Sequence, residues 1–188
     1  VKVLDDFAEA VSWLEGIGET DQLGLYYFSE DDFEGLAACK ADNVPVYIPA
    51  EGMMTAAVLR EMAAAAAKRA GVCCMIDVKQ QLYWLELSEE DGIFDAAIAA
   101  YLINPLKDSY TYDGIAQDFL GMTVPSRADW LKKMTLTEAS EKDKESFGHY
   151  LAYSAMIPVQ VYGALKNRLE ETGMDRLFDE IEMPLVYA

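Results

Sequence analysis

The sequence predicts an α/β fold in which helices cover a mixed β-sheet of about five strands. Three short apolar runs rich in Tyr, Val and Ile lie between residues 23 and 48, with polar turns between them, as in an antiparallel meander. Helical and strand-like segments alternate from residue 52 to residue 102, and the pattern from Tyr112 to Ala188 is almost entirely helical. This order of elements is typical of the α/β class. With 188 residues and no Pro- or Ser-rich linker, the chain is expected to form one domain spanning 1–188.

Apolar spacing and turn residues set the expected bounds of each element. A leading helix within residues 1–20 is expected over Lys2–Leu14, ended by Gly16 and Gly18. The expected strands are Leu23–Phe28, Gly35–Cys39, Val44–Ile48, Val72–Ile76 and Ile93–Phe94. The expected helices are Gly52–Ala70, the segment from Asp77 to Leu87, and Ala96–Leu102 with Asp95 as its N-cap. Pro45 and Pro49 predict an edge position for the third strand, because Pro cannot donate a ladder hydrogen bond.

The chain is strongly acidic. It carries 15 Lys and Arg against 33 Asp and Glu, a formal net charge of −18, and the excess is steepest over Val1–Glu51. Affinity for a phosphate backbone grows with the number of Lys and Arg contacts, so a protein with this balance holds nucleic acid poorly. The composition therefore does not support a stand-alone nucleic-acid-binding module, and we expect the domain to bind DNA weakly at most.

The sequence also indicates where the protein resides. No apolar run approaches the roughly 20 residues that span a bilayer, and Val1–Gly16 lacks the basic start and apolar stretch of a signal peptide. We expect a cytoplasmic protein without a membrane partner. Cys39, Cys73 and Cys74 show no zinc-site spacing and are expected to be reduced, buried cysteines within strands.

Three segments in the second half of the chain carry a resemblance to a known family. They are Phe94–Pro105 (FDAAIAAYLINP), Tyr110–Gly121 (YTYDGIAQDFLG) and Ile181–Val186 (IEMPLV). In this order they resemble the family A DNA polymerases, of which bacterial DNA polymerase I is a member, where FD…AYLLNP, YxLDxLAxx(Y/F)LG and ExPL follow one another. The resemblance covers roughly Leu23–Ala188 and implies a 3′–5′ exonuclease domain with a ribonuclease H-like fold of the DnaQ type.

The resemblance implies a partner as well. In this family the third motif opens the polymerase region, so residues 175–188 are expected to lead into a polymerase domain of the same chain. That domain is expected to supply the main contact with DNA and to be the part that requires Mg²⁺.

The resemblance further implies the position of a nuclease site. Exonucleases of this fold use two divalent ions about 4 Å apart, held by several converging carboxylates. The family supplies Asp-x-Glu on the first strand, an Asp after the fourth strand, and Tyr-x-x-x-Asp on a late helix. In this chain Phe28 and Glu30 stand at the first pair, and Asp77 stands at the second position within MIDVK. Tyr150 and Ser154 stand at the third.

Two of the four expected carboxylates are therefore missing, because Phe28 and Ser154 replace them. A hydroxyl cannot supply the charge of a carboxylate, and a Phe side chain fills the space of an ion. We expect a vestigial site that holds no metal and no cofactor, in a domain without nuclease activity that supports the polymerase. Asp77 is expected to cap a helix whether or not a metal is bound.

Two alternatives remain open from the sequence. The first is an active, metal-dependent proofreading exonuclease that uses Glu30 and Asp77, with Asp31 or Asp32, which otherwise look like turn residues, as a further ligand. The second is an independent binding or adaptor domain. The single histidine, His149, has no nucleophile and orienting group in its neighbourhood, so a surface or packing role is expected.

Overall fold

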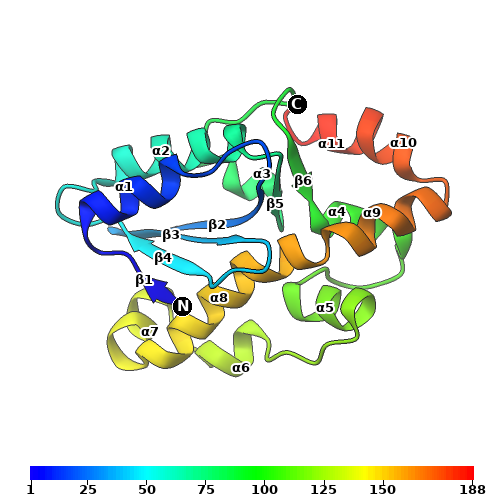
Figure 1. Ribbon diagram of the computed structural model, residues 1–188. Helices are drawn as coiled ribbons and strands as arrows, with labels where there is room; N and C mark the ends of the chain where they lie inside the picture. Colours follow the sequence, from blue (N-terminus) through cyan, green and yellow to red (C-terminus); the bar gives the residue numbers. More distant parts are fainter.

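A computed structural model describes all residues, 1–188, and contains one six-stranded mixed sheet in the order β1-β4-β3-β2-β5-β6 (Figure 1). The strands are β1 (Lys2–Val3), β2 (Gln22–Glu30), β3 (Phe33–Lys40), β4 (Val46–Pro49), β5 (Val72–Met75) and β6 (Ile93–Asp95). The strand pairs β2–β3 and β3–β4 are antiparallel, and the other three pairs are parallel. The predicted α/β class and helix-flanked mixed sheet are confirmed, with six strands in place of about five.

The sixth strand corrects two expectations at the N-terminus. Lys2–Val3 forms β1, parallel to β4, and the leading helix begins only at Phe7. The segment Val44–Ile48 is therefore not at the sheet edge. The backbone N–H of Lys2 donates to the carbonyl of Pro45 at 2.9 Å, so the ladder uses an acceptor, which Pro retains.

Helices occupy most of the remaining chain. They are α1 (Phe7–Glu15), α2 (Ala56–Arg69), α3 (Val78–Gln81), α4 (Ala96–Ile103), α5 (Tyr112–Leu120), α6 (Arg127–Leu131), α7 (Leu136–Lys142), α8 (Lys144–Gln160), α9 (Tyr162–Glu171), α10 (Asp175–Leu177), the π-helical η1 (Phe178–Glu182) and α11 (Met183–Leu185). The helical pattern expected beyond Tyr112 is confirmed. No helix combines the length and the apolar character that crossing a membrane requires.

The helix expected from Asp77 to Leu87 is wrong in length, because α3 ends at Gln81. The side chain of Gln81 turns inward and is buried against β2. Its amide accepts a hydrogen bond from the Tyr27 N–H at 2.8 Å and donates one to the Tyr27 carbonyl at 3.0 Å. Strand β5 pairs with β2 only as far as Gly24, and Gln81 bonds to β2 farther along, at Tyr27. After Gln81 the chain continues in turns.

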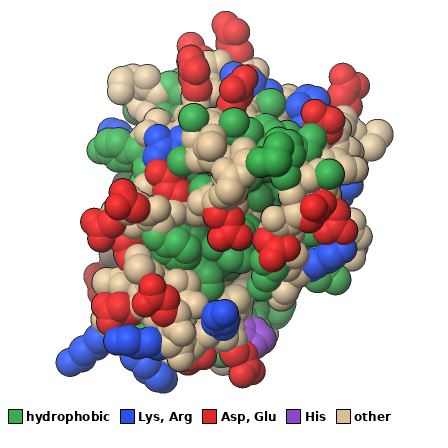
Figure 2. Space-filling model, turned by 90° about the vertical axis from the view of Figure 1, so that its left-hand side faces the viewer, with side chains coloured by type: hydrophobic (Ala, Val, Ile, Leu, Met, Phe, Trp, Pro, Cys, Tyr) green, Lys and Arg blue, Asp and Glu red, His purple; other side chains and the backbone are tan.

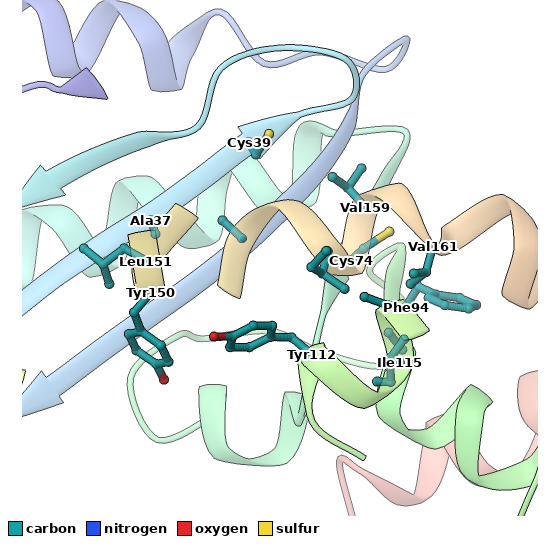
Figure 3. Close-up of a cluster of buried hydrophobic side chains, with 14 of the residues drawn as sticks. Ala37, Cys39, Cys74, Phe94, Tyr112, Ile115, Tyr150, Leu151, Val159 and Val161 are labelled. Atoms are coloured by element: carbon teal, nitrogen blue, oxygen red, sulfur yellow. The ribbon is translucent and has the colours of Figure 1, made fainter. Parts of the chain in front are cut away.

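The sheet separates two hydrophobic cores. Helices α1 and α2 cover one face and α8 crosses the other, with α4, α5 and α9 beside it (Figure 1). Helix α8 lies directly on β2, because a Cβ atom at Gly24 would come within 1.9 Å of the Ala155 carbonyl oxygen. Leu151 and Val159 of α8 belong to the cluster of buried side chains shown in Figure 3. This close approach places the residues of α8 next to the side chains of β2.

Candidate functional site

A pocket of about 850 Å³ lies on the α8 side of the sheet. It collects side chains from elements that are distant in sequence. These include Tyr26 of β2, Asp77 before α3, Tyr112 of α5, Arg127 of α6, and Tyr150 and Ser154 of α8. Three of the residues expected at the vestigial site, Asp77, Tyr150 and Ser154, are therefore brought together.

A hydrogen-bonded group of two tyrosines and one arginine lines this pocket. The Arg127 guanidinium donates to the Tyr150 hydroxyl at 2.7 Å, and that hydroxyl lies 3.2 Å from the hydroxyl of Tyr26. The Arg127 guanidinium carbon also lies 4.9 Å from the centroid of the Tyr150 ring, within cation–π range. Burial raises the pKa of Tyr26, so this hydroxyl stays neutral. Figure 3 shows the Tyr150 ring beside that of Tyr112, and their centroids are 6.1 Å apart.

Ser154 does not present a free ligand to the pocket. Its hydroxyl donates to the carbonyl of Tyr150 one turn earlier in α8, at 2.8 Å, and only 8% of the residue is exposed. A Ser hydroxyl in a helix satisfies itself in this way when no external partner competes. Ser154 therefore supplies no charge to the pocket, and its hydroxyl donates its hydrogen to the backbone of α8.

Asp77 stands at the turn that leads into α3. It adopts the left-handed conformation, with φ of 61°, and its exposed side chain accepts from the Gln80 N–H at 3.3 Å as an N-cap. The expected capping role is present in the structure. A second carboxylate fixes this turn, because Asp95 accepts from the N–H groups of Asp77 at 3.3 Å and Val78 at 2.8 Å.

Asp95 also caps α4, as expected, by accepting from the N–H groups of Ala97 at 2.9 Å and Ile98 at 3.2 Å. Burial raises the pKa of this carboxyl, which is 2% exposed, although four backbone N–H groups favour its charged form. The sequence indicated the cap but not the link to Asp77. Both carboxylate oxygens accept hydrogen bonds from backbone N–H groups, so Asp95 links the starts of α3 and α4.

The structure does not bring Phe28 or Glu30 to the pocket. Side chains alternate along a strand, so Tyr26, Phe28 and Glu30 share one face of β2 but lie at successive depths. Phe28 is 2% exposed and packs among aromatic rings, with centroids 5.1 Å from Phe33 and 6.0 Å from Phe147. The β2 residue at the pocket is Tyr26, two positions before Phe28, which the family resemblance implied.

Glu30 contacts α7 instead of Asp77. Its carboxylate accepts from the Leu136 N–H at 3.1 Å, the Thr137 N–H at 3.0 Å and the Thr137 hydroxyl at 2.8 Å. Burial raises the pKa of Glu30, but these hydrogen bonds outweigh burial and hold the pKa below its usual value. Asp31 lies in the β2–β3 turn with φ of 54°, and Asp32 is exposed beside it. The alternative set of Glu30, Asp77 and a turn Asp is not assembled at one point.

The donors around the pocket do not fit a two-metal centre. No group of three or more His, Cys, Asp or Glu side chains gathers anywhere in the chain. Asp95 has both oxygens occupied by N–H groups, Ser154 is bonded to its own helix, and a guanidinium lies against the two tyrosines. Two hard cations require several oxygen anions directed at one place.

Sequence reasoning missed Arg127 and Tyr26. The sequence contained a signal for Tyr26, because it lies two positions before Phe28 and side chains two positions apart share one face of a strand. Arg127 had no signal in the sequence, because it follows the second of the three family segments, in a stretch that none of them covers. Its partner Tyr150 is 23 residues away. His149 is exposed and stacks on Trp130, with ring centroids 4.6 Å apart, which is the packing role expected of it.

The acidic character of the sequence is visible on one face of the protein. On the face shown in Figure 2, Asp and Glu side chains are spread widely, while Lys and Arg gather at a few places and form no continuous stripe. A nucleic-acid strand requires a basic track for its phosphates. This face offers none.

Comparison with known proteins places these observations in context. No family model matches the chain. The chain is 32% identical to DNA polymerase I of Treponema pallidum (strain Nichols) over 103 residues, which is 50% of this chain and 9% of that protein. The chain therefore corresponds to a small part of the length of that polymerase.

Solved structures share the fold over nearly the whole chain. Brucella melitensis NrnC superimposes with a TM-score of 0.61 at 11% identity, covering 90% of this chain and 84% of that one. NrnC with bound Mg²⁺ gives a TM-score of 0.58 at 12% identity, covering 99% of this chain and 89% of that one. An apo form of a nuclease gives 0.61 at 13% identity with the same coverage. The predicted fold is confirmed, and half of the chain is similar in sequence to part of a DNA polymerase I.

Proposed function

We propose that this chain is a catalytically inactive 3′–5′ exonuclease-like domain that serves as a structural module of a DNA polymerase I in replication and repair. The observation that carries the proposal is the hydrogen bond from Arg127 to Tyr150 in the pocket. A guanidinium is a permanent cation, so it repels Mg²⁺ from the position that it occupies.

The surrounding residues support the same reading. Tyr26 offers a neutral hydroxyl where a strand carboxylate would be needed, and the Ser154 hydroxyl is bonded within α8. Asp77 is left as an exposed helix cap. The Asp95 carboxylate accepts from backbone N–H groups, and no three acidic side chains gather at one point, so two divalent ions would not be held against their mutual repulsion and that of Arg127.

The test is degradation of a single-stranded oligonucleotide labelled at its 5′ end, with the protein in excess and with Mg²⁺ or Mn²⁺ present. We expect the oligonucleotide to keep its full length. Metal-dependent shortening from the 3′ end that is lost in Asp77→Ala would show an active nuclease and refute the proposal.

The polymerase partner is part of the proposal. The similarity to a DNA polymerase I, of which this chain matches a small part, supports a polymerase domain in the same protein. Ile181 and Leu185, on η1 and α11, are 50% and 56% exposed and form an apolar surface for such a neighbour. A longer version of the chain that includes the polymerase region is expected to melt at a higher temperature, since burial gains about 25 cal/mol per Å² of apolar surface. An unchanged melting temperature would count against this contact.

DNA contact is proposed to come mainly from that polymerase domain. The net charge of −18 predicts that this domain alone binds single-stranded DNA no more tightly than about 10⁻⁴ M at physiological salt. Fluorescence anisotropy with a labelled oligonucleotide measures this value. Micromolar affinity would contradict the proposal.

A further inference from the structure

Strand β1 leaves one edge of the sheet open. It stands at the end of the strand order, beside β4, and no strand pairs with its other side (Figure 1). The N–H of Lys2 donates to the Pro45 carbonyl at 2.9 Å, and the N–H of Leu4 donates to the Tyr47 carbonyl at 2.8 Å. Backbone groups alternate in direction along a strand, so the N–H and carbonyl of Val3 point to the open edge. Unpaired groups at such an edge are a template for one more strand.

A groove of about 400 Å³ lies between β1 and α1. The residues that line it are Lys2, Leu4, Ala8, Glu9, Ser12 and Trp13. Lys2 and Leu4 point to this groove, and side chains alternate along a strand, so the side chain of Val3 lies on the opposite face of the sheet. Val3 is 50% exposed there. A strand added beside β1 would therefore find contacts on both of its faces, with the groove on one side and Val3 on the other.

The charge around this edge is negative. Asp5 and Asp6 follow β1 directly and Glu9 lines the groove, and all three are exposed. None of them forms an ion pair, and Lys2 is the one cation that lines the groove. Over residues 1–51 the chain has twelve acidic residues and two lysines. A second copy of the chain would bring like charges together at this edge, whereas a segment that carries Lys or Arg would meet unpaired carboxylates.

We propose that β1 and the groove beside it form a docking edge for an extended, basic segment of another protein, which adds a further strand to the sheet. Main-chain hydrogen bonds to Val3 hold the segment, and its alternate side chains occupy the groove. Lys or Arg residues that flank the segment pair with Asp5, Asp6 and Glu9. The docking edge shares no residue with the pocket on the α8 side of the sheet, so the proposal does not depend on the proposed loss of nuclease activity.

Fluorescence anisotropy with the labelled peptide KKVTVTVKK tests the proposal, because its β-branched core favours an extended chain and its ends are basic. We expect saturable binding at physiological salt with a dissociation constant of about 1 mM or tighter. The peptide EEVTVTVEE has the same core with acidic ends and is expected to bind at least about tenfold more weakly. The peptide KKVPPTVKK keeps the charge but lacks one backbone donor on each of its edges, so it is expected to bind at least about fivefold more weakly.

Variants of the protein locate the binding edge. Val3→Pro removes the donor at the open edge, while the N–H groups of Lys2 and Leu4 keep their bonds to the neighbouring strand, and it is expected to weaken KKVTVTVKK at least about fivefold. Glu9→Gln, an exposed substitution that keeps the test decisive if Val3→Pro fails to fold, is expected to weaken the same peptide about threefold. Glu170→Gln, at an exposed glutamate of α9 outside the groove, is the matched control and is expected to leave binding unchanged.

The proposal is overturned if KKVTVTVKK does not bind, or if either of the other two peptides binds equally well. It is also overturned if a folded Val3→Pro protein binds like the parent, or if Glu9→Gln and Glu170→Gln have the same effect. Sedimentation velocity of the protein alone examines the other occupant. A dimer that Val3→Pro dissociates would assign the edge to a second copy of the chain and refute the basic partner. None of these measurements uses DNA or metal, so they report separately from the oligonucleotide degradation assay.

Discussion

The Arg127 guanidinium donates a hydrogen bond of 2.7 Å to the hydroxyl of Tyr150, and the two residues belong to α6 and α8. The same hydroxyl lies 3.2 Å from that of Tyr26 on β2, so one contact joins two helices and the central sheet. Three elements that are far apart in the sequence are therefore linked at the pocket.

Removal of the Tyr150 hydroxyl is expected to destabilise the protein. Tyr150→Phe removes a buried hydroxyl that accepts from the exposed Arg127 and lies 3.2 Å from the Tyr26 hydroxyl, and it should lower the free energy of unfolding by about 1 kcal/mol. Urea unfolding measures the change. Tyr101→Phe, at a tyrosine whose hydroxyl has no protein partner, is the control and is expected to stay within about 0.5 kcal/mol. Equal stability of Tyr150→Phe and the parent would show that the contact carries no weight.

Glu30 is expected to stabilise the protein in a pH-dependent way. Its carboxylate caps α7 through Leu136 and Thr137, so Glu30→Gln should cost about 1 kcal/mol at pH 7. The folded-state pKa of Glu30 is depressed. Its contribution is therefore complete above the unfolded pKa, about 4.3, and is lost as pH falls through the folded pKa.

Urea unfolding of the parent and Glu30→Gln at several pH values checks this. The difference between them should be largest from pH 6 to 7 and should shrink as the pH falls below about 4.3. Glu141→Gln, at an exposed glutamate of α7, is the control and should stay within about 0.5 kcal/mol of the parent at pH 7. A difference that grows as the solution is acidified would refute the assigned role of Glu30.

The amide of Gln81 is expected to matter more than that of its neighbour. Gln81→Leu leaves the N–H and carbonyl of Tyr27 buried without partners and should cost about 2 kcal/mol or more. Gln80→Leu, on the exposed side of α3, is expected to stay within about 0.5 kcal/mol. The two midpoints of urea unfolding give the comparison. Equal losses would mean that Gln81 does not act through the strand.

Much of the fold follows from local signals in the sequence. The apolar runs around Leu23 and Gly35 are separated by a polar turn, as in a meander, and Asp95 stands where a cap is needed. Lys2–Val3 was missed because two residues are too few for a periodic pattern, and their pairing with β4 is a tertiary contact. The short α3 was missed because Gln81 bonds to a strand 54 residues away.

The candidate site was predictable only in part. Asp77, Tyr150 and Ser154 meet in the pocket, as the family spacing implied. The β2 residue was displaced by two because the strand positions differ only in depth along one face, and alternation cannot distinguish Tyr26 from Phe28. Arg127 could not have been found, since nothing in its local sequence reports a partner on another helix.

The measurement that tests the inactive-site proposal most directly is a titration with Mn²⁺, followed by the electron paramagnetic resonance signal of the free ion. The parent and Asp77→Asn are compared, because Asn caps a helix about as well as Asp and tolerates the left-handed conformation. We expect both proteins to leave the same amount of Mn²⁺ free, apart from weak attraction to the acidic surface, which they share. Saturable, stoichiometric binding of Mn²⁺ by the parent that disappears in Asp77→Asn would contradict the proposal and establish a working metal site.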